Sequence, residues 1–304
     1  MRNPSISVII PHLNQPEALV RCLSALACQN GCFELVDILV VDNGSVVFPD
    51  ALCAGHPSVT LLSETEWGPG PARNTGVAHA SGEILAFVDA DCVPHLNWLA
   101  VITKSFRNNP GTEITGGPVR IEIQHDHPLS ALEAYERIYA FRIEDYVRRQ
   151  NFVGTGNMAV RQDVLTAVGP FAGIEVSEDL DWGQRAHKLG YRIQFNPDMA
   201  VSHPTRGSFV ALKQKWDRQI AHQQGAIQRQ RFAFLRTVLI AGVLAVSPLI
   251  EIPRILTSHR VRGARQRWLA FVCLTRIRLY RACRMLSVLT LQNQDKLLSH
   301  WNRP

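Results

Sequence analysis

Acidic residues are almost missing from the last third of the sequence. Residues 204–304 contain only three Asp and Glu against 18 Lys and Arg, whereas residues 1–203 contain 23 and 14. The formal net charge of +6 therefore conceals a front part of charge −9 and a tail of charge +15. Such an asymmetry is typical of a chain whose tail contacts nucleic acid or an anionic membrane surface.

A complete metal-binding cluster of cysteines is also missing. The seven Cys are scattered and odd in number, and Cys28 and Cys32 have no further ligands nearby to complete the set of about four that a zinc site requires. We expect reduced thiols in a cytosolic protein. The first apolar run, SISVIIP from Ser5, follows the start of the sequence without a basic and apolar leader, so we expect no secretory signal peptide.

A long hydrophobic run is absent as well. The most apolar stretch of the tail, residues 237–250, has 14 residues, fewer than the roughly 20 of a bilayer span. Pro248 and Pro253 are expected to break or kink a helix there. This stretch by itself does not predict a transmembrane helix.

The end of the tail has an amphipathic pattern. Over residues 268–291, three arginines lie on one side of a predicted helix and apolar residues on another. With the apolar stretch before it, this pattern predicts that residues 207–304 form a basic helical tail that lies on the inner face of the cell membrane. A helical subdomain packed on the core is the alternative.

Two nucleotide-binding fingerprints are missing. The sequence has no G-x-G-x-x-G after a strand and no G-K-[ST], which argues against a dinucleotide dehydrogenase and against a P-loop kinase. Apolar runs at residues 8–10, 38–41 and 84–88 alternate instead with helical patterns at 16–27 and 72–80. Strands and helices that alternate in this way predict an α/β fold with a mostly parallel sheet flanked by helices.

The remaining pattern continues this fold. Further helices are predicted over 96–108, 129–149, 177–191, 208–236 and from about 162, and strands over 114–123 and 192–204. Ligands of such sheets bind beyond the carboxyl ends of the strands. Asn14, Asp42, Asp89 and Asp91 follow the first strands at these ends.

Asp89 and Asp91 end the buried run LAFVDADCVP. Past a strand end the chain can turn both carboxylates toward one ion, and hard cations such as Mg²⁺ and Mn²⁺ bind oxygen ligands that they share with substrate phosphates. An acidic turn would have the same sequence. Asp42 in VVDNGS is open to the same two readings, because a carboxylate there can accept hydrogen bonds from a nucleoside or simply close a turn.

Six motifs occur in a fixed order: VIIPHLN, VVDNGS, GPARNTG, FVDADCVP, GTGNMAVRQDVLTAVGPF and SEDLDWGQRAHKLGYRI. Together they resemble the family 2 glycosyltransferases over roughly residues 5 to 206. The resemblance implies the GT-A fold, with a domain of residues 1–206 that divides into a nucleotide-binding half (1–92) and an acceptor half (93–206). Residues 207–304 would form the helical C-terminal extension.

The resemblance also implies a reaction. A nucleotide-sugar donor, often a UDP-sugar, would transfer its sugar to an acceptor hydroxyl of a glycan or lipid-linked molecule with inversion, in the presence of Mn²⁺ or Mg²⁺. The implied site residues are, for the donor, Pro11, Asn14, Asp42, Arg73, Asp89, Gly156 and Asn157; for the metal, Asp91, Asp89 and His203; and for catalysis, Glu178 and Asp179.

Within this set the acids differ in role. Asp91 is expected to bind the metal and Asp89 the ribose or the loop, while Asp179 takes the proton of the acceptor as general base. Asp179 stands at a predicted helix start, where the helix dipole favours its ionised form. Asp181 is a competitor that the sequence leaves open.

Alternatives to this function also remain. Trp216 and Arg218 only loosely match the Q-x-x-R-W segment of processive relatives, and their order is wrong, so we expect one sugar to be added, in cell-envelope or exopolysaccharide glycan synthesis. A sugar nucleotidyltransferase is disfavoured because PHLNQPE is neither glycine-rich nor basic. A non-catalytic sugar-nucleotide binder would have no need of the acids. Nucleic-acid binding by the tail lacks a known motif.

Overall fold

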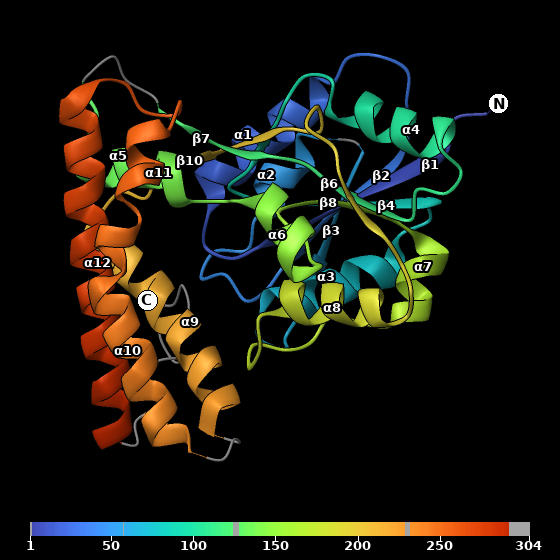
Figure 1. The fold of residues 1–304 in the computed structure, drawn as a ribbon. Helices are drawn as coiled ribbons and strands as arrows, with labels where there is room; N and C mark the ends of the chain where they lie inside the picture. The colour runs from blue at the N-terminus through green and yellow to red at the C-terminus, as the bar shows by residue number, and fades with distance from the viewer. Residues whose placement is uncertain (1, 57, 124–127, 229–231, 292–304) are drawn as a thin grey trace. The chain divides into compact units, whose positions relative to one another are not determined.

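The computed structural model describes the backbone of residues 2–56, 58–123, 128–228 and 232–291 (Figure 1). The chain divides into two compact units. We call residues 1–120 with 141–203 the sheet unit, and residues 121–140 with 204–304 the helical unit. The segment 121–140, which lies inside the first domain expected from the sequence, thus belongs to the same unit as the tail.

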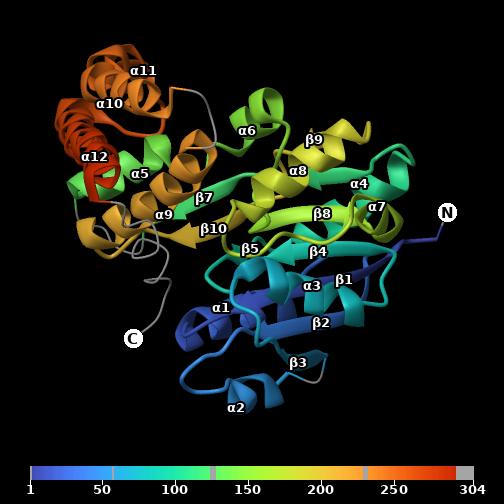
Figure 2. The ribbon, with the colours of Figure 1, turned by 90° about the horizontal axis from the view of Figure 1, so that it is seen from below.

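The sheet unit contains a seven-stranded sheet in the order β3-β2-β1-β4-β8-β6-β9 (Figure 2). Its strands are β1 (Ser5–His12), β2 (Glu34–Asp42), β3 (Val59–Ser63), β4 (Ile84–Val88), β6 (Ile114–Gly116), β8 (Asn157–Arg161) and β9 (Ile193–Phe195). Neighbours pair in parallel except β8, which is antiparallel to β4 and β6. The predicted α/β fold with a mostly parallel sheet is confirmed.

Helices cover both faces of this sheet. They are α1 (Pro16–Ala27), α2 (Asp50–Ala54), α3 (Pro69–His79), α4 (Trp98–Asn108), α6 (Ile143–Gln150), α7 (Gln162–Val168) and α8 (Glu178–Lys188). Figure 1 shows α1 and α4 on one face, with α3, α7 and α8 on the other. All residues of β4 are buried, as its uninterrupted apolar sequence predicts for a strand covered on both sides.

The register of the strands assembles one edge of the sheet. His12 lies opposite Asp42 where β1 and β2 end, and Val88 at the end of β4 lies opposite Asn157 at the start of β8. Because β8 is antiparallel, its first residues share an edge with the last residues of β1, β2 and β4. We call this edge the carboxyl edge.

A small second sheet has the order β5-β10-β7, with β5 (Val93–Pro94), β10 (Val201–Pro204) and β7 (Val119–Glu122). The predicted strand over 114–123 is divided between the two sheets at Gly117 and Pro118. A Cβ on Gly117 would lie 1.7 Å from the Met199 carbonyl oxygen, so this close crossing of two backbones requires glycine. The predicted strand over 192–204 is likewise two strands, β9 and β10.

The helical unit contains α5 (Ala131–Tyr139), α9 (Phe209–Gln228), α10 (Ala233–Ile250), α11 (Ile252–Thr257) and α12 (Gly263–Leu291). The predicted helix over 129–149 is two helices, α5 and α6, because Phe141 has a φ of 48° in the left-handed region and interrupts the helix. Ser130 begins α5 with a capping box in which its hydroxyl accepts from the Glu133 amide. Helices α10 and α12 pack side by side (Figure 1).

Helix α10 differs from the expectation for its apolar stretch. Pro248 does not break it, because the Leu244 carbonyl, which a proline at 248 leaves without an amide donor, accepts a hydrogen bond from the Ser247 hydroxyl at 2.8 Å. By length and composition, Ala233–Thr257 could cross a membrane: its most apolar stretch of 18 residues has a mean hydropathy of 2.1, and 22% of that stretch is buried in the protein. The helical segment thus extends beyond the 14 uncharged residues of the apolar stretch at both of its ends.

Candidate active site

Arg73 joins two segments of the carboxyl edge. It comes from α3, is 3% exposed, and donates to Asp89 Oδ1 at 2.7 Å and to Glu178 Oε1 at 2.9 Å. Glu178 begins α8, whereas Asp89 follows β4. From the sequence Arg73 is a contact of the nucleotide. The structure gives its guanidinium a different environment, buried between two carboxylates that it holds in place.

Asp179 lies next to Glu178 in the first turn of α8. Its Oδ1 accepts from the Ser177 hydroxyl at 2.8 Å and from the Leu180 amide at 2.7 Å. Its Oδ2 has no hydrogen-bond partner among the described residues and lies 3.7 Å from the place of a Cβ on Gly154. Burial and the neighbouring Glu178 carboxylate raise the pKa of Asp179 to about 6. A carboxylate with this pKa and one free oxygen can accept a proton near neutral pH.

Asp181 has a different environment. Its Oδ2 accepts from Arg185 Nε at 2.9 Å, and the same guanidinium donates to the carbonyls of Val168 and Pro170. Asp181 is thus committed to an ion pair on the surface of α8. The geometry favours Asp179 over its competitor as the base.

The loop of residues 154–156 enters β8 at the carboxyl edge. A Cβ on Gly156 would lie 2.6 Å from Asp89 Oδ2, so only glycine lets the loop backbone approach this carboxylate. Asn157, predicted to contact the donor, is instead fully buried. It accepts from Trp98 Nε1 and donates to the carbonyls of Met199 and Pro118. This environment does not fit a contact between the Asn157 side chain and a donor sugar.

Asp91 and His203 lie together. The antiparallel pairing of β10 with β5 brings His203 Nε2 to 3.2 Å from Asp91 Oδ2, and the Phe141 ring packs on the imidazole at 4.7 Å between centroids. Both side chains are partly exposed. In the described part of the chain no group of three or more His, Cys, Asp or Glu could hold a metal. One carboxylate oxygen and one imidazole nitrogen would supply two of the roughly six ligands of such a cation, and donor phosphates and water could supply the others.

The first two strand ends are fastened by a buried pair that the sequence does not reveal. The Gln15 amide donates to His12 Nε2, so Nδ1 carries the proton and donates to Asp42 Oδ1 at 2.9 Å. Asp42 also accepts from the Gly44 and Ser45 amides and from the Ser45 hydroxyl. With 2% of Asp42 exposed, a nucleoside would reach its carboxylate only if the turn at 44–45 opened.

Asn14 completes this fastening. It has a φ of 52°, its amide donates to the Ser45 hydroxyl, and its Oδ1 accepts from the Val46 amide. Pro11, in β1, is half-buried beside it. The loops after β1 and β2 therefore form one hydrogen-bonded wall, which we call the His12–Asp42 clasp. The sequence indicates only that His12 stands at a strand end; its burial, which makes a hydrogen-bond partner necessary, is visible in the structure alone.

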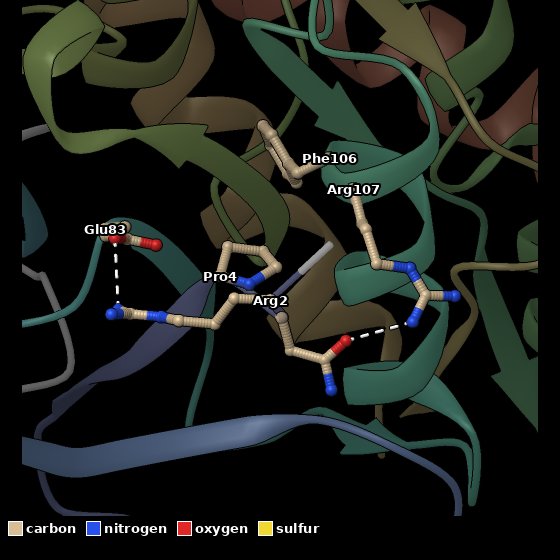
Figure 3. A pocket seen from close by; sticks show the side chains of 6 residues that line it. Arg2, Pro4, Glu83, Phe106 and Arg107 are labelled. Carbon is tan, nitrogen blue, oxygen red and sulfur yellow. Dashed lines mark hydrogen bonds and ion pairs between the residues drawn. The ribbon is translucent and has the colours of Figure 1, made fainter.

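A shallow pocket of about 390 Å³ lies elsewhere, lined by Arg2, Asn3, Pro4, Glu83, Phe106 and Arg107 (Figure 3). Arg2 pairs with Glu83 at 3.2 Å, and Arg107 donates to Asn3 at 3.0 Å. Pro4 and Glu83 directly precede β1 and β4, so this pocket is at the opposite edge of the sheet from the acids. It takes no part in the candidate site.

Comparisons with known proteins identify the fold and the family of the chain. The chain is 34% identical to glycosyltransferase AglE of Haloferax volcanii over 219 residues, which cover 70% of this chain and 71% of that protein. Its fold matches the mannosyltransferase PcManGT from Pyrobaculum calidifontis, solved with GDP-Man and Mn²⁺, with a TM-score of 0.59 at 19% identity, over 97% of this chain and 88% of that one.

A second solved structure, S. aureus TarS 1-349 with UDP-GlcNAc, matches with a TM-score of 0.53 at 16% identity and covers 97% of this chain and 90% of that one. These likenesses show the GT-A fold. The model of the family "Glycosyl transferase family 2" matches residues 7–169, more than half of the chain. The chain therefore belongs to the family 2 glycosyltransferases and is an enzyme that transfers sugar from a nucleotide-sugar.

Proposed function

We propose that this enzyme transfers one sugar from a nucleotide-sugar, a UDP-sugar in the first instance, to an acceptor hydroxyl with inversion and with the help of a divalent cation. One observation carries the proposal. Asp179, with a free Oδ2 and a raised pKa, lies beside Gly154, and the same loop approaches Asp89 through Gly156. A base and a donor-side carboxylate thus meet at one short loop.

The reaction is a single displacement. Asp179 Oδ2 accepts the proton of the acceptor hydroxyl as its oxygen forms a bond to the anomeric carbon. The bond from that carbon to the diphosphate oxygen breaks, and the nucleoside diphosphate leaves with the electron pair. One displacement inverts the anomeric centre, and it requires one base and no covalent intermediate. Arg73 positions Asp89 and Glu178 but, as a buried group, does not touch the reacting atoms.

Asp91 and His203 are the residues that would hold the cation. Their mixed oxygen and nitrogen donors suit Mn²⁺ better than Mg²⁺, which prefers oxygen alone. A divalent cation supplies charge neutralisation for the leaving diphosphate. The clasp of His12, Asp42 and Asn14, with Pro11 beside it, would form the wall of the nucleoside pocket.

The proposal is tested by donor hydrolysis. The purified full-length chain should slowly hydrolyse a member of a panel of UDP- and GDP-sugars when Mn²⁺ is present, and EDTA should abolish this activity. Asp91→Asn should lower the rate on the order of 10²-fold. Asp163→Asn, an exposed acid in the first turn of α7, is the matched control and should keep the parent rate. An Asp91→Asn variant as fast as the parent would refute the metal role.

The location of the reaction is also proposed. Helix α10 exposes a row of apolar side chains, and the tail is strongly basic. We infer that the helical unit holds the enzyme at the cytoplasmic surface of the membrane, where it would extend an envelope glycan or exopolysaccharide carried on a lipid. The proposal includes the division of the chain into a glycosyltransferase domain of residues 1–206 and a membrane-associated tail of residues 207–304.

A further inference from the structure

Ser177 occupies the N-cap of α8, directly before the two acids of the candidate site. A serine at this position ordinarily accepts a hydrogen bond from a backbone amide two or three residues further on. In α8 the Ser177 side chain makes no such capping bond. Its hydroxyl donates instead to Asp179 Oδ1 at 2.8 Å. The serine thus serves the carboxylate rather than the helix end.

A second helix of the same chain has the ordinary arrangement. Ser130 is the N-cap of α5, and its hydroxyl accepts from the Glu133 amide at 3.2 Å within a capping box. The backbone of Ser130 and that of Ser177 are both extended. The difference between the two serines therefore lies in what the hydroxyl contacts, and only Ser177 contacts an acid of the candidate site.

Oδ1 of Asp179 accepts two hydrogen bonds. The Leu180 amide, one of those that an N-cap side chain usually binds, also donates to this oxygen, at 2.7 Å. The Ser177 carbonyl accepts from the Asp181 amide at 2.9 Å, which fixes the backbone of Ser177 to the first turn of α8. The carboxylate cannot rotate without breaking both bonds to Oδ1. Its Oδ2 is thereby kept on the side of Gly154.

We propose that Ser177 is a positioning residue of the reaction, whose hydroxyl holds the Asp179 carboxylate so that Oδ2 is presented to the acceptor hydroxyl. The inference rests on the proposed function, because it requires Asp179 to be the base. Ser177 acts through this base and touches neither substrate. A base must lie within hydrogen-bond reach of the proton that it accepts, and a small displacement of it lowers the rate.

The same hydroxyl favours the ionised base. Burial, and then the Glu178 carboxylate, raise the pKa of Asp179, whereas the hydrogen bond from Ser177 lowers it. Arg73 of α3 also lowers this pKa, and Tyr146 of α6 interacts with Asp179 as a phenol whose own pKa is raised by burial. Replacement of Ser177 leaves these three side chains in place, so a change in the titration of Asp179 reports on the hydroxyl.

The variant Ser177→Gly tests the inference in the full-length chain. Glycine is nearly as good an N-cap as serine but has no hydroxyl, so the exchange spares the helix and removes the hydrogen bond. We expect kcat for donor hydrolysis to fall on the order of tenfold, with KM for the donor unchanged. The acidic limb of the pH profile should move to higher pH by about half a unit or more, because the ionised base loses a donor.

Further variants separate positioning from helix capping. Ser177→Thr keeps the hydroxyl and should restore both kcat and the limb, and Ser177→Cys, a weak donor, should give an intermediate limb. Ser130→Gly is the matched control, because it makes the same exchange at a serine that does cap its helix; it should leave the limb and kcat unchanged. An unmoved limb in folded Ser177→Gly would overturn the inference, as would an equal movement in Ser130→Gly or no restoration in Ser177→Thr.

The carboxyl group can also be titrated directly, without substrate. The signal of Asp179 in the NMR spectrum of the chain labelled with ¹³C at its aspartate carboxyls is the one that disappears in Asp179→Asn. Its midpoint should lie at about pH 6 in the parent and at higher pH in Ser177→Gly. Equal midpoints in the two proteins would show that the hydroxyl does not hold the carboxylate.

The two proposals fail separately. If Asp179→Asn abolishes hydrolysis but Ser177→Gly changes neither the titration nor the pH profile, the proposed base stands and the role of Ser177 is wrong. If the NMR midpoint moves in Ser177→Gly but Asp179→Asn hydrolyses the donor as fast as the parent, the hydrogen bond stands and the proposed base is wrong.

Discussion

At the scale of the residue, the properties of Asp179 determine a pH dependence. Its pKa is raised to about 6, and a general base acts only when ionised. We therefore expect kcat/KM for the donor to fall tenfold per pH unit below pH 6 and to level off above it. Glu178→Gln removes the second cause of the raised pKa and should move this limb to lower pH. A profile without a limb between pH 5 and 7 would contradict the assignment.

Two variants complete this test. Asp179→Asn should lower kcat on the order of 10²-fold or more, whereas Asp181→Asn should keep most of the activity because Asp181 serves Arg185. The pKa of Asp179 is higher in the folded state, at about 6, than the ordinary value of 3.8 expected for the unfolded chain. Ionisation of Asp179 therefore destabilises the folded state as the pH rises from about 4 through 6. Asp179→Asn should therefore unfold at higher urea than the parent at pH 8, with no gain near pH 4.

The sequence located the acids of the site but not their partners. Asp89, Asp91, Glu178 and Asp179 follow strand ends or begin a helix, and such positions can be read from apolar periodicity. The links of Arg73 to two of these acids span 16 and 105 residues, and no local pattern contains them. Asn157 shows the opposite error: it belongs to a motif, but its side-chain amide binds other groups of the fold and is not available to a ligand.

At the scale of the element, substitution of a glycine tests how closely the loop of residues 154–156 must approach Asp89. Gly156→Ala would place a Cβ 2.6 Å from a carboxylate that Arg73 fixes. Asp89 must then shift, and we expect donor hydrolysis to fall on the order of 10²-fold. Gly242→Ala is the control, because its Cβ meets nothing within 4 Å in helix α10. It should keep full activity and stabilise the helix by about 0.5–1 kcal/mol.

Most elements could be predicted because they bury an apolar side in a regular pattern. The first helices and strands agree with the structure to within a few residues. The failures occur where one residue or one crossing decides: Phe141 in a left-handed conformation divides a helix, and Gly117 divides a strand where two backbones meet. In α10 a serine hydroxyl compensates for Pro248, a contact that the bare presence of proline does not indicate.

At the scale of the whole molecule, the exposed apolar side of α10 should govern membrane binding. Leu239, Val243 and Leu249 are each about 60% exposed. We expect the parent to pellet with anionic liposomes and a triple change of these residues to Gln to abolish pelleting. The control is Val36→Gln, which replaces an exposed apolar residue on β2 and should leave pelleting unchanged. Leu244 of α10 is buried and is therefore unsuitable as a control.

Salt separates the two forces in this binding. Pelleting of the parent should weaken but persist as ionic strength rises, because the basic tail is screened whereas apolar insertion is not. Loss of all pelleting at moderate salt would show that charge alone holds the enzyme on the membrane. Pelleting of the triple variant at parent level would show that another surface is used.

The position of Arg73 restricts which amino-acid replacements this sequence can accept during evolution. A buried cation that satisfies Asp89 and Glu178 makes three positions, on three separate segments, dependent on one another. Replacement of Arg73 alone removes the cation that pairs with both carboxylates, and replacement of either acid leaves the Arg73 cation partly unpaired. The effects of replacements at positions 73, 89 and 178 on stability are therefore expected to be non-additive. In an alignment of relatives of this chain, a change at one of the positions 73, 89 and 178 should therefore accompany changes at the other two.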